Sequence, residues 1–332
     1  MHLKEDNLHL HEEIHDKIFE IGERERVIES GGYFINGGDT FHVRGLIRTS
    51  CFDLLHRKRK GWLDKGLKKH IDIIGNHDQE DKDGNIHPMR VFEQFGWHVV
   101  DRPMRIDNFF YAFPYMNRLE EEILKIPTAQ KKKSVALVHT GVHGAFKNDG
   151  TLDDFSIHPE AFKDFRMAFS GHYHNRILYG TNFQFIGSPM QHTFSEMGQD
   201  KGVLIYNRKL NKYKFVEIPG PKHKEVSAEF VDGKMVLTDT DDIGESDIVR
   251  VRIHGSSAEV SSVTKSDFEF KCGVMKIERK TVDASASRIK VDDASSSDLL
   301  EMYVDYVDPD LDRKKLLMIG SKFMGETNHA NV

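Results

Sequence analysis

The stretch Gly75-Asn76-His77-Asp78 follows a short, mostly apolar run, Ile71 to Ile74, in this 332-residue sequence. The run is brief and rich in isoleucine, which is typical of a buried strand. The stretch then lies on the loop at the strand's carboxyl end, where open α/β sheets place their chemistry. The Asn76 amide oxygen is a hard metal ligand, and His77 can hold or release a proton near neutral pH. The plain alternative is a turn, because Gly-Asn is also turn chemistry.

A second predicted strand brings a carboxylate to its end. Residues 33–35 are apolar and run directly into Gly37-Gly38-Asp39-Thr40-Phe41-His42. We expect a helix before this strand, over residues 5–30, and a basic helix after it, over residues 45–69. The order strand, helix, strand predicts a βαβ unit and an α/β fold.

Two more predicted strands end in histidines. Residues 134–138 lead to His139, and residues 167–169 lead to Gly171-His172-Tyr173-His174. A single histidine after a strand is usually a structural, hydrogen-bonded residue. Five potential ligands at separate strand ends seldom arise by chance, so together they predict a metal site. These five residues are Asp39, Asn76, His139, His172 and His174.

The predicted ligands combine carboxylate, amide and imidazole groups. Such a mixture suits manganese, iron or zinc better than magnesium or calcium, and soft copper sites are not favoured. Asp39 can bridge two cations, which then polarise a phosphate and generate hydroxide from water. This predicts phosphoester hydrolysis, in which an unligated His77 protonates the leaving oxygen or steadies the phosphate. For Asp39 alone, the alternative is a helix cap.

The sequence changes character at about residue 219. A strand over 247–254, a helix over 259–271 and a strand over 274–282 predict a small βαβ module. Beyond a Ser- and Asp-rich linker, two amphipathic helices are expected over 298–307 and 310–323. Two lone helices cannot bury their apolar sides, so they dock on the body or on a partner. The expected parts are the site domain over 1–218, the α+β capping module over 219–285, and the linker with its helix pair over 286–332.

Composition limits the class of protein. Charged residues make up 30% of the sequence and no apolar run approaches a membrane span, so no membrane association is expected. The two cysteines show no disulfide or zinc pattern, which favours a reducing, cytoplasmic compartment. The net charge is −6, yet Arg57, Lys58, Arg59 and Lys60 form a basic cluster. This cluster is either a DNA-contacting surface or a solvated helix face.

Four motifs occur in order over the first 218 residues: GGDxFH, GNHD, the lone His139 after a strand, and GHxH. In this they resemble the calcineurin-type metallophosphoesterases, and His42 resembles the histidine of the DNA-repair nucleases among them. The chain is similar to the SbcD family of double-strand-break nucleases and to the small subunit of phage recombination endonucleases. Gly187-Ser188-Pro189, Phe194 and Glu196 also resemble that group. The resemblance implies a β-sandwich flanked by helices.

The resemblance implies a role for each matching residue. Asp39 would bridge both metals, with His174 on the first metal, Asn76, His139 and His172 on the second, and His42 with His77 as the catalytic pair. The family's first metal also takes a D-x-H motif that ends the first strand. Here His2 matches the histidine, and the Asp would fall before residue 1. In the sequence as given, the first strand and that Asp are therefore expected to be missing.

The resemblance further implies two cations, manganese in first place, with magnesium, iron or zinc as alternatives. It implies 3'-to-5' exonuclease action on duplex DNA, endonuclease action on single strands or hairpins, and an SbcC-type ATPase partner for the carboxyl-terminal helices. The location would be cytoplasmic, in a host cell if a phage encodes the protein, and a homodimer stays open. Two other functions also stay open: a phosphatase or cyclic-nucleotide phosphodiesterase on the same scaffold, and a metal-poor subunit that only docks DNA or an ATPase.

Overall fold

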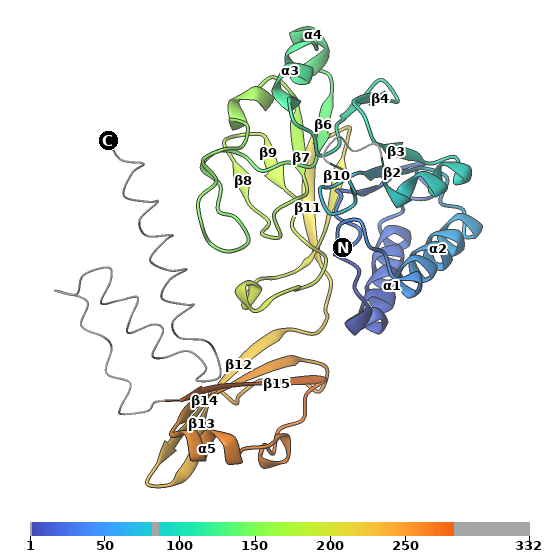
Figure 1. Ribbon diagram of the computed structural model, residues 1–332. Helices are drawn as coiled ribbons and strands as arrows, with labels where there is room; N and C mark the ends of the chain where they lie inside the picture. Colours follow the sequence, from blue (N-terminus) through green and yellow to red (C-terminus); the bar gives the residue numbers. More distant parts are fainter. Residues whose placement is uncertain (1, 82–85, 282–332) are drawn as a thin grey trace, which may run out of the picture.

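The computed structural model describes residues 2–81 and 86–281, which form a mixed α/β protein (Figure 1). Up to residue 218, two β-sheets face each other and carry helices on their outer sides. A separate four-stranded sheet follows. In the described ranges no helix is both long and apolar enough to cross a membrane.

The first sheet is parallel and has the order β1-β2-β3. Its strands are β1 (Phe34–Asn36), β2 (His70–Ile73) and β3 (His98–Val100). On the outer face lie α1 (Leu8–Arg24) and α2 (Thr49–Asp64), with Leu55 and Trp62 of α2 packed near Val99. Because β1 and β2 are parallel and α2 joins them, the predicted βαβ unit is confirmed.

The second sheet has six strands in the order β4-β5-β6-β7-β9-β8. They are β4 (Met104–Ile106), β5 (Phe110–Ala112), β6 (Val135–Val138), β7 (Met167–Ser170), β8 (Leu178–Tyr179) and β9 (Phe183–Phe185). The four central strands are parallel, and the two edge strands run antiparallel. Leu137 and Phe169 on its inner face meet Ile71 and Ile73 of the first sheet. Burial of apolar surface between the sheets is therefore what holds the two layers together.

Helices also cover the outer face of the second sheet. They are α3 (Leu119–Leu124) and the 3-10 helix η3 (Pro159–Phe162), which share a buried cluster with Ala136 and Phe183. The layers are thus helix, sheet, sheet, helix. Four further short helices lie between these elements: the 3-10 helices η1 (Glu5–Asn7), η2 (Pro88–Phe95) and η4 (Phe194–Glu196), and the α-helix α4 (Thr128–Lys131).

The first two helices are shorter than the sequence predicted. The helix expected over 5–30 ends at Arg24, and Arg26 just beyond it has a left-handed φ of 57°. The helix expected over 45–69 spans Thr49–Asp64 and is followed by Gly66 at φ 97°. Left-handed residues end helices, and periodicity alone does not locate them.

A hairpin extends the layer of the first sheet. It pairs β10 (Gly202–Asn207) with β11 (Lys212–Glu217). Leu204 packs toward the core between the two sheets, whereas Val203 packs toward α1. The hairpin therefore packs between the second sheet and α1, as β1 does.

A slot of about 250 Å³ separates β1 from this hairpin. Residues 33–38 line one side and residues 202–206 line the other. Among the described strands, β1 pairs only with β2 and β10 only with β11, so both present an open edge to the slot. On the loop that follows β1, Phe41 forms an isolated parallel bridge with Leu3.

The four-stranded sheet forms the small module, in the order β13-β12-β14-β15. Its elements are β12 (His223–Val231), β13 (Lys234–Thr238), β14 (Ile248–Gly255), α5 (Ser257–Ser262), η5 (Lys265–Asp267) and β15 (Val274–Thr281). Parallel β14 and β15 joined through α5 match the predicted βαβ pattern. The β12–β13 hairpin was not predicted, although Val226, Ala228 and Phe230 alternate as in a half-buried strand. The helix expected over 259–271 is shorter. The linker and the helices expected over 298–307 and 310–323 lie outside the described residues.

Candidate metal centre

Asp39 lies on a tight loop after β1, where the close packing around Gly38 and Gly75 leaves no room for a larger side chain. A Cβ on Gly38 would lie 2.2 Å from His139 Nδ1, and one on Gly75 would lie 2.2 Å from Asp39 Oδ1. Only glycine allows these approaches. Asp39 itself has a left-handed φ of 52°, and so do two other predicted ligands, His2 at 51° and His172 at 74°. Such strained residues cluster at functional sites, where the surrounding structure must hold them.

The first group of converging ligand atoms comes from both sheets. Asp39, His139 and His172 each offer one atom, and all three atoms lie within 4.8 Å of one another. Asn76 Oδ1 lies 3.2 Å from His139 Nε2 and 3.1 Å from His172 Nδ1. The Nδ1 of His139 donates to the carbonyl of Gly37 at 2.6 Å, which turns its Nε2 toward the other three side chains. The four side chains thus form a cation-sized cluster.

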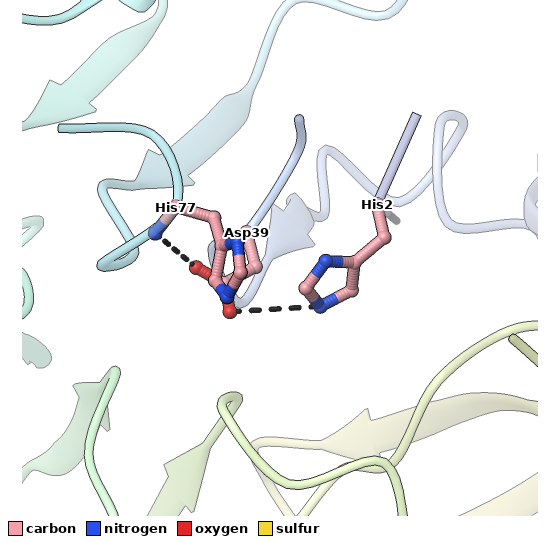
Figure 2. Close-up of side chains that lie close together, drawn as sticks. All are labelled: His2, Asp39 and His77. Atoms are coloured by element: carbon pink, nitrogen blue, oxygen red, sulfur yellow. Dashed lines mark hydrogen bonds and ion pairs between the residues drawn. The ribbon is translucent and has the colours of Figure 1, made fainter. Parts of the chain in front are cut away.

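The second group shares the same carboxylate. His2, Asp39 and His77 point toward one another (Figure 2) and offer atoms within 4.8 Å. His2 Nε2 lies 3.6 Å from Asp39 Oδ2, and the backbone N–H of His77 donates to Oδ1 at 2.9 Å. His174 joins through His2, with 3.0 Å between their Nε2 atoms. The predicted ligands His2 and His174 are therefore adjacent, and His77, predicted as unligated, is close enough to serve as a ligand.

His42 lies at the exposed mouth of the cluster. Its backbone carbonyl accepts a 2.6 Å hydrogen bond from His77 Nδ1. A carbonyl only accepts, so the neutral His77 ring carries its proton on Nδ1 and keeps Nε2 unprotonated. The His42 ring lies 5.6 Å from the His2 ring, centroid to centroid. The structure thus brings the predicted catalytic pair, His42 and His77, to the cluster.

Burial and charge prepare these groups to bind a cation. Burial lowers the pKa of His172 to about 3 and holds the pKa of His2 far below its usual range, so both rings are neutral at pH 7, the form that can bind a cation. Burial alone would raise the pKa of Asp39, but the neighbouring His139 holds it below the usual range and keeps the carboxylate charged. Burial also opposes charge on His139, yet Asp39 raises the pKa of that ring. Without a cation, this imidazole and carboxylate compensate each other.

Asp78 is a structural residue of this centre that sequence reasoning did not single out. Its Oδ1 accepts N–H bonds from Thr40 at 2.8 Å and Phe41 at 3.1 Å, and its Oδ2 accepts one from Gly75 at 3.0 Å. Burial and the charge of Asp39 raise the pKa of Asp78 above its usual range. One buried carboxylate thus ties the Asp39 loop to the Asn76 loop. The position of Asp78 in the stretch 75–78 was the sequence feature that indicated a role in this centre.

Glu196 orients His174. Its Oε1 accepts a 2.8 Å hydrogen bond from His174 Nδ1, which directs Nε2 toward His2. Lys201 Nζ lies 2.7 Å from the other carboxylate oxygen. Burial would raise the pKa of Glu196, but these two partners lower it to about 2. Such an outer carboxylate fixes the tautomer of a metal-binding histidine.

Two further side chains support the histidines, and no sequence pattern indicated them. Asn148, from the long loop after His139, accepts from the backbone N–H of His174 at 2.8 Å and donates to the carbonyl of His172 at 3.4 Å. It therefore stabilises the strained turn between them. The Tyr115 ring stacks on His172 at a centroid distance of 6.0 Å.

The basic cluster predicted to contact DNA is engaged within the protein. Arg59 is 3% exposed and its guanidinium pairs with buried Asp72 at 2.5 Å, so its predicted DNA contact is wrong. Lys58 pairs with Asp16 at 2.8 Å. Arg57 and Lys60 are exposed, and they pair with Asp53 at 2.9 Å and Asp64 at 2.6 Å. The spacing of Leu55, Arg59 and Trp62 was the signal that Arg59 lies on the buried face of α2.

Two comparisons with known proteins found no relative of this chain. No family model matches the chain, and no curated protein matches it significantly. The described residues do hold two His/Asp groups that could bind metal ions, with Asp39 in both.

Proposed function

We propose that the protein is a calcineurin-type metallophosphoesterase of the SbcD kind, which uses two divalent cations to hydrolyse phosphodiester bonds in DNA. One observation carries the proposal: Asp39 is common to two adjacent ligand groups, with His139 Nε2 3.3 Å and His2 Nε2 3.6 Å from its Oδ2. A carboxylate shared in this way suits a bridged pair of cations. The mixture of imidazole, amide and carboxylate favours manganese, with magnesium, iron or zinc as alternatives.

The layered fold supports the same assignment. Two facing sheets with helices on both outer sides fit the sandwich that the sequence resemblance implies, and the ligands come from loops at the strand ends. In this proposal the small module caps the site, and an SbcC-type ATPase is the partner. Duplex DNA would be cut from its 3' end, and single strands or hairpins internally.

The chain's own residues have distinct tasks in the reaction. Bound cations would polarise the phosphate and lower the pKa of a water molecule. Hydrolysis joins the oxygen of water to phosphorus and breaks one P–O ester bond, whose electron pair leaves with the departing oxygen. That oxygen takes up a proton, and the products are a phosphate monoester and an alcohol. His77, oriented by the His42 carbonyl, presents Nε2 at the cluster and in its protonated form supplies this proton.

Manganese-dependent DNA cleavage tests the proposal. The full chain with Mn²⁺ is incubated with labelled duplex and hairpin DNA, beside His139→Ala and the control His143→Ala, a histidine outside both ligand groups. We expect cleavage by the wild type and the control, and a loss of roughly 100-fold or more in His139→Ala. No cleavage by the wild type, or equal cleavage by both variants, overturns the proposal. Turnover of small phosphomonoesters without DNA cleavage supports the phosphatase alternative instead.

A further inference from the structure

Arg44 lies beside the candidate metal centre, on the exposed loop that follows Asp39 and His42. Its Nε donates a 2.9 Å hydrogen bond to the backbone carbonyl of Asn76. The side-chain oxygen of Asn76 is the atom that lies between His139 and His172. The Arg44 guanidinium is therefore hydrogen-bonded to the backbone of Asn76, a candidate metal ligand.

The charge of Arg44 has no acidic partner in the part of the chain that the structure describes. Other exposed arginines nearby are paired: Arg48 lies 3.5 Å from Glu5, and Arg57 lies 2.9 Å from Asp53. For Arg44 the one described polar contact is the Asn76 carbonyl, made by Nε alone. The two terminal nitrogens still carry N–H groups that face no described acceptor.

The loop that carries Arg44 is held against the cluster at several points. His77 Nδ1 bonds to the His42 carbonyl at 2.6 Å, and Asp78 binds the N–H groups of Thr40 and Phe41. Arg44 thus follows a segment, residues 40–42, whose backbone is held by three hydrogen bonds to the 77–78 stretch. A guanidinium anchored in this way loses little further freedom when it binds an anion.

We propose that Arg44 is a phosphate-binding catalytic residue, whose terminal N–H groups donate to the non-bridging oxygens of the substrate phosphate. The inference rests on the proposed phosphodiester hydrolysis and adds the residue that holds its substrate. A planar guanidinium matches the spacing of phosphate oxygens with two parallel hydrogen bonds. It also stabilises the charge that builds on these oxygens as water attacks. Arg44 gives up no proton in this role.

Variants of Arg44 test the proposal on two readouts. Hydrolysis of a small phosphodiester, bis(p-nitrophenyl) phosphate, and binding of inorganic phosphate are measured on the Mn²⁺-loaded full chain. We expect Arg44→Ala to lower kcat/KM and to weaken phosphate binding, each on the order of 10-fold to 100-fold. Arg44→Lys restores part of the kcat/KM and part of the phosphate binding, because an ammonium keeps the positive charge but lacks the two parallel N–H groups of a guanidinium. The control Arg48→Ala removes a neighbouring charge and leaves kcat/KM and phosphate binding unchanged.

Manganese content separates a failure of this inference from a failure of the proposed function. We expect Arg44→Ala to bind as much Mn²⁺ as the wild type, since Arg44 contacts a backbone carbonyl and no ligand atom. If Arg44→Ala behaves like Arg48→Ala in both assays, the inference is wrong and the metallophosphoesterase remains. If the wild type hydrolyses nothing, the proposed function fails, and phosphate binding alone decides about Arg44. Absence of phosphate binding by the wild type overturns the inference as well.

Discussion

Asp78 shows most clearly how one side chain determines the geometry of the whole centre. Three backbone N–H groups from Thr40, Phe41 and Gly75 converge on its two oxygens. They fix the loop that carries Asp39 against the loop that carries Asn76. A buried carboxylate with three donors is far more stable than one without them.

Asp78→Asn therefore tests this role at the scale of one residue. The amide retains the shape of the carboxylate but turns an NH₂ group toward an N–H donor, so at least one hydrogen bond is lost. We expect the free energy of unfolding to fall by about 2 to 3 kcal/mol, measured by urea denaturation. The matched control is Asp154→Asn, an exposed residue for which little change is expected. Equal urea midpoints for the two variants would contradict the role of Asp78.

The sequence predicted the identity of the ligands better than that of their supports. Asp39, Asn76 and His139 were recognisable because each follows an apolar strand, and parallel strands bring such ends together. The role of Glu196 toward His174 was not evident, because the contact spans 22 residues and has no periodicity. Support of this kind depends on tertiary packing, which local patterns do not encode.

At the scale of elements, α1 carries a buried histidine that makes the fold sensitive to acid. His15 is 2% exposed, donates from Nδ1 to the His11 carbonyl at 2.7 Å and packs near Trp62. Burial lowers the pKa of His15 to about 4. The unfolded chain, with a histidine pKa near 6.5, then binds more protons than the folded chain between these values. Stability from this group is present above pH 6.5 and is lost as the pH falls toward 4.

His15→Gln keeps a hydrogen-bond donor but does not titrate. At pH 5 the neutral ring of His15 accounts for a loss of about 2 kcal/mol relative to pH 7.5. We expect the variant to lose correspondingly less stability over this interval, measured by urea denaturation at both pH values. An unchanged difference between the two pH values would show that His15 does not contribute. Other buried histidines, such as His223 with a pKa lowered by burial to about 4, leave part of the acid sensitivity in place.

The slot between β1 and β10 leads to a prediction about strands. Both edges are open among the described strands, and residues 33–38 and 202–206 line the slot. His2 and Leu3 already lie along the Asp39 loop, with the His2 N–H donating to the Asp39 carbonyl at 2.8 Å. A strand fused ahead of them would run parallel to β1 and could pair with both edges.

We expect an apolar, β-branched extension of about six residues at the amino terminus to fill this slot, since one residue is needed beside each residue of the lining segment 33–38. New pairing and burial should raise the melting temperature by roughly 5 °C. The control is a Gly/Ser extension of equal length, which has no side chains to bury. Equal melting temperatures for the two extensions would mean that the slot does not accept a strand.

The helices and strands themselves were largely predictable, and their limits were not. Strands near 71–74, 134–138 and 167–169 stand out because they are short and apolar. The two-residue strand β8 and the polar hairpin of β12 and β13 lack such a pattern. Pairing with neighbouring strands, which lie far away in the sequence, is what makes these segments strands.

At the scale of the whole molecule, the candidate ligands connect the two sheets. Asp39 and Asn76 follow strands of the first sheet, whereas His139 and His172 follow strands of the second. A cation held by all four would therefore cross-link the two layers. Binding that occurs only in the folded state stabilises it by mass action.

We expect Mn²⁺ to raise the stability of the full chain and a chelator to lower it. At 100 times the dissociation constant, the stabilisation is about 2.7 kcal/mol, which appears as a higher melting temperature. His139→Ala should lose this response, while the control His143→Ala should keep it. A melting temperature that does not change with Mn²⁺ would contradict a cation that links the sheets.

The most direct test of the central claim, that Asp39 joins two adjacent cations, is the electron paramagnetic resonance spectrum of the Mn²⁺-loaded protein. Two manganese ions about 3.5 to 4 Å apart give an exchange-coupled signal. We predict this signal for the wild type and its loss in Asp39→Asn. A spectrum of isolated manganese that is the same in both proteins would contradict the bridged pair.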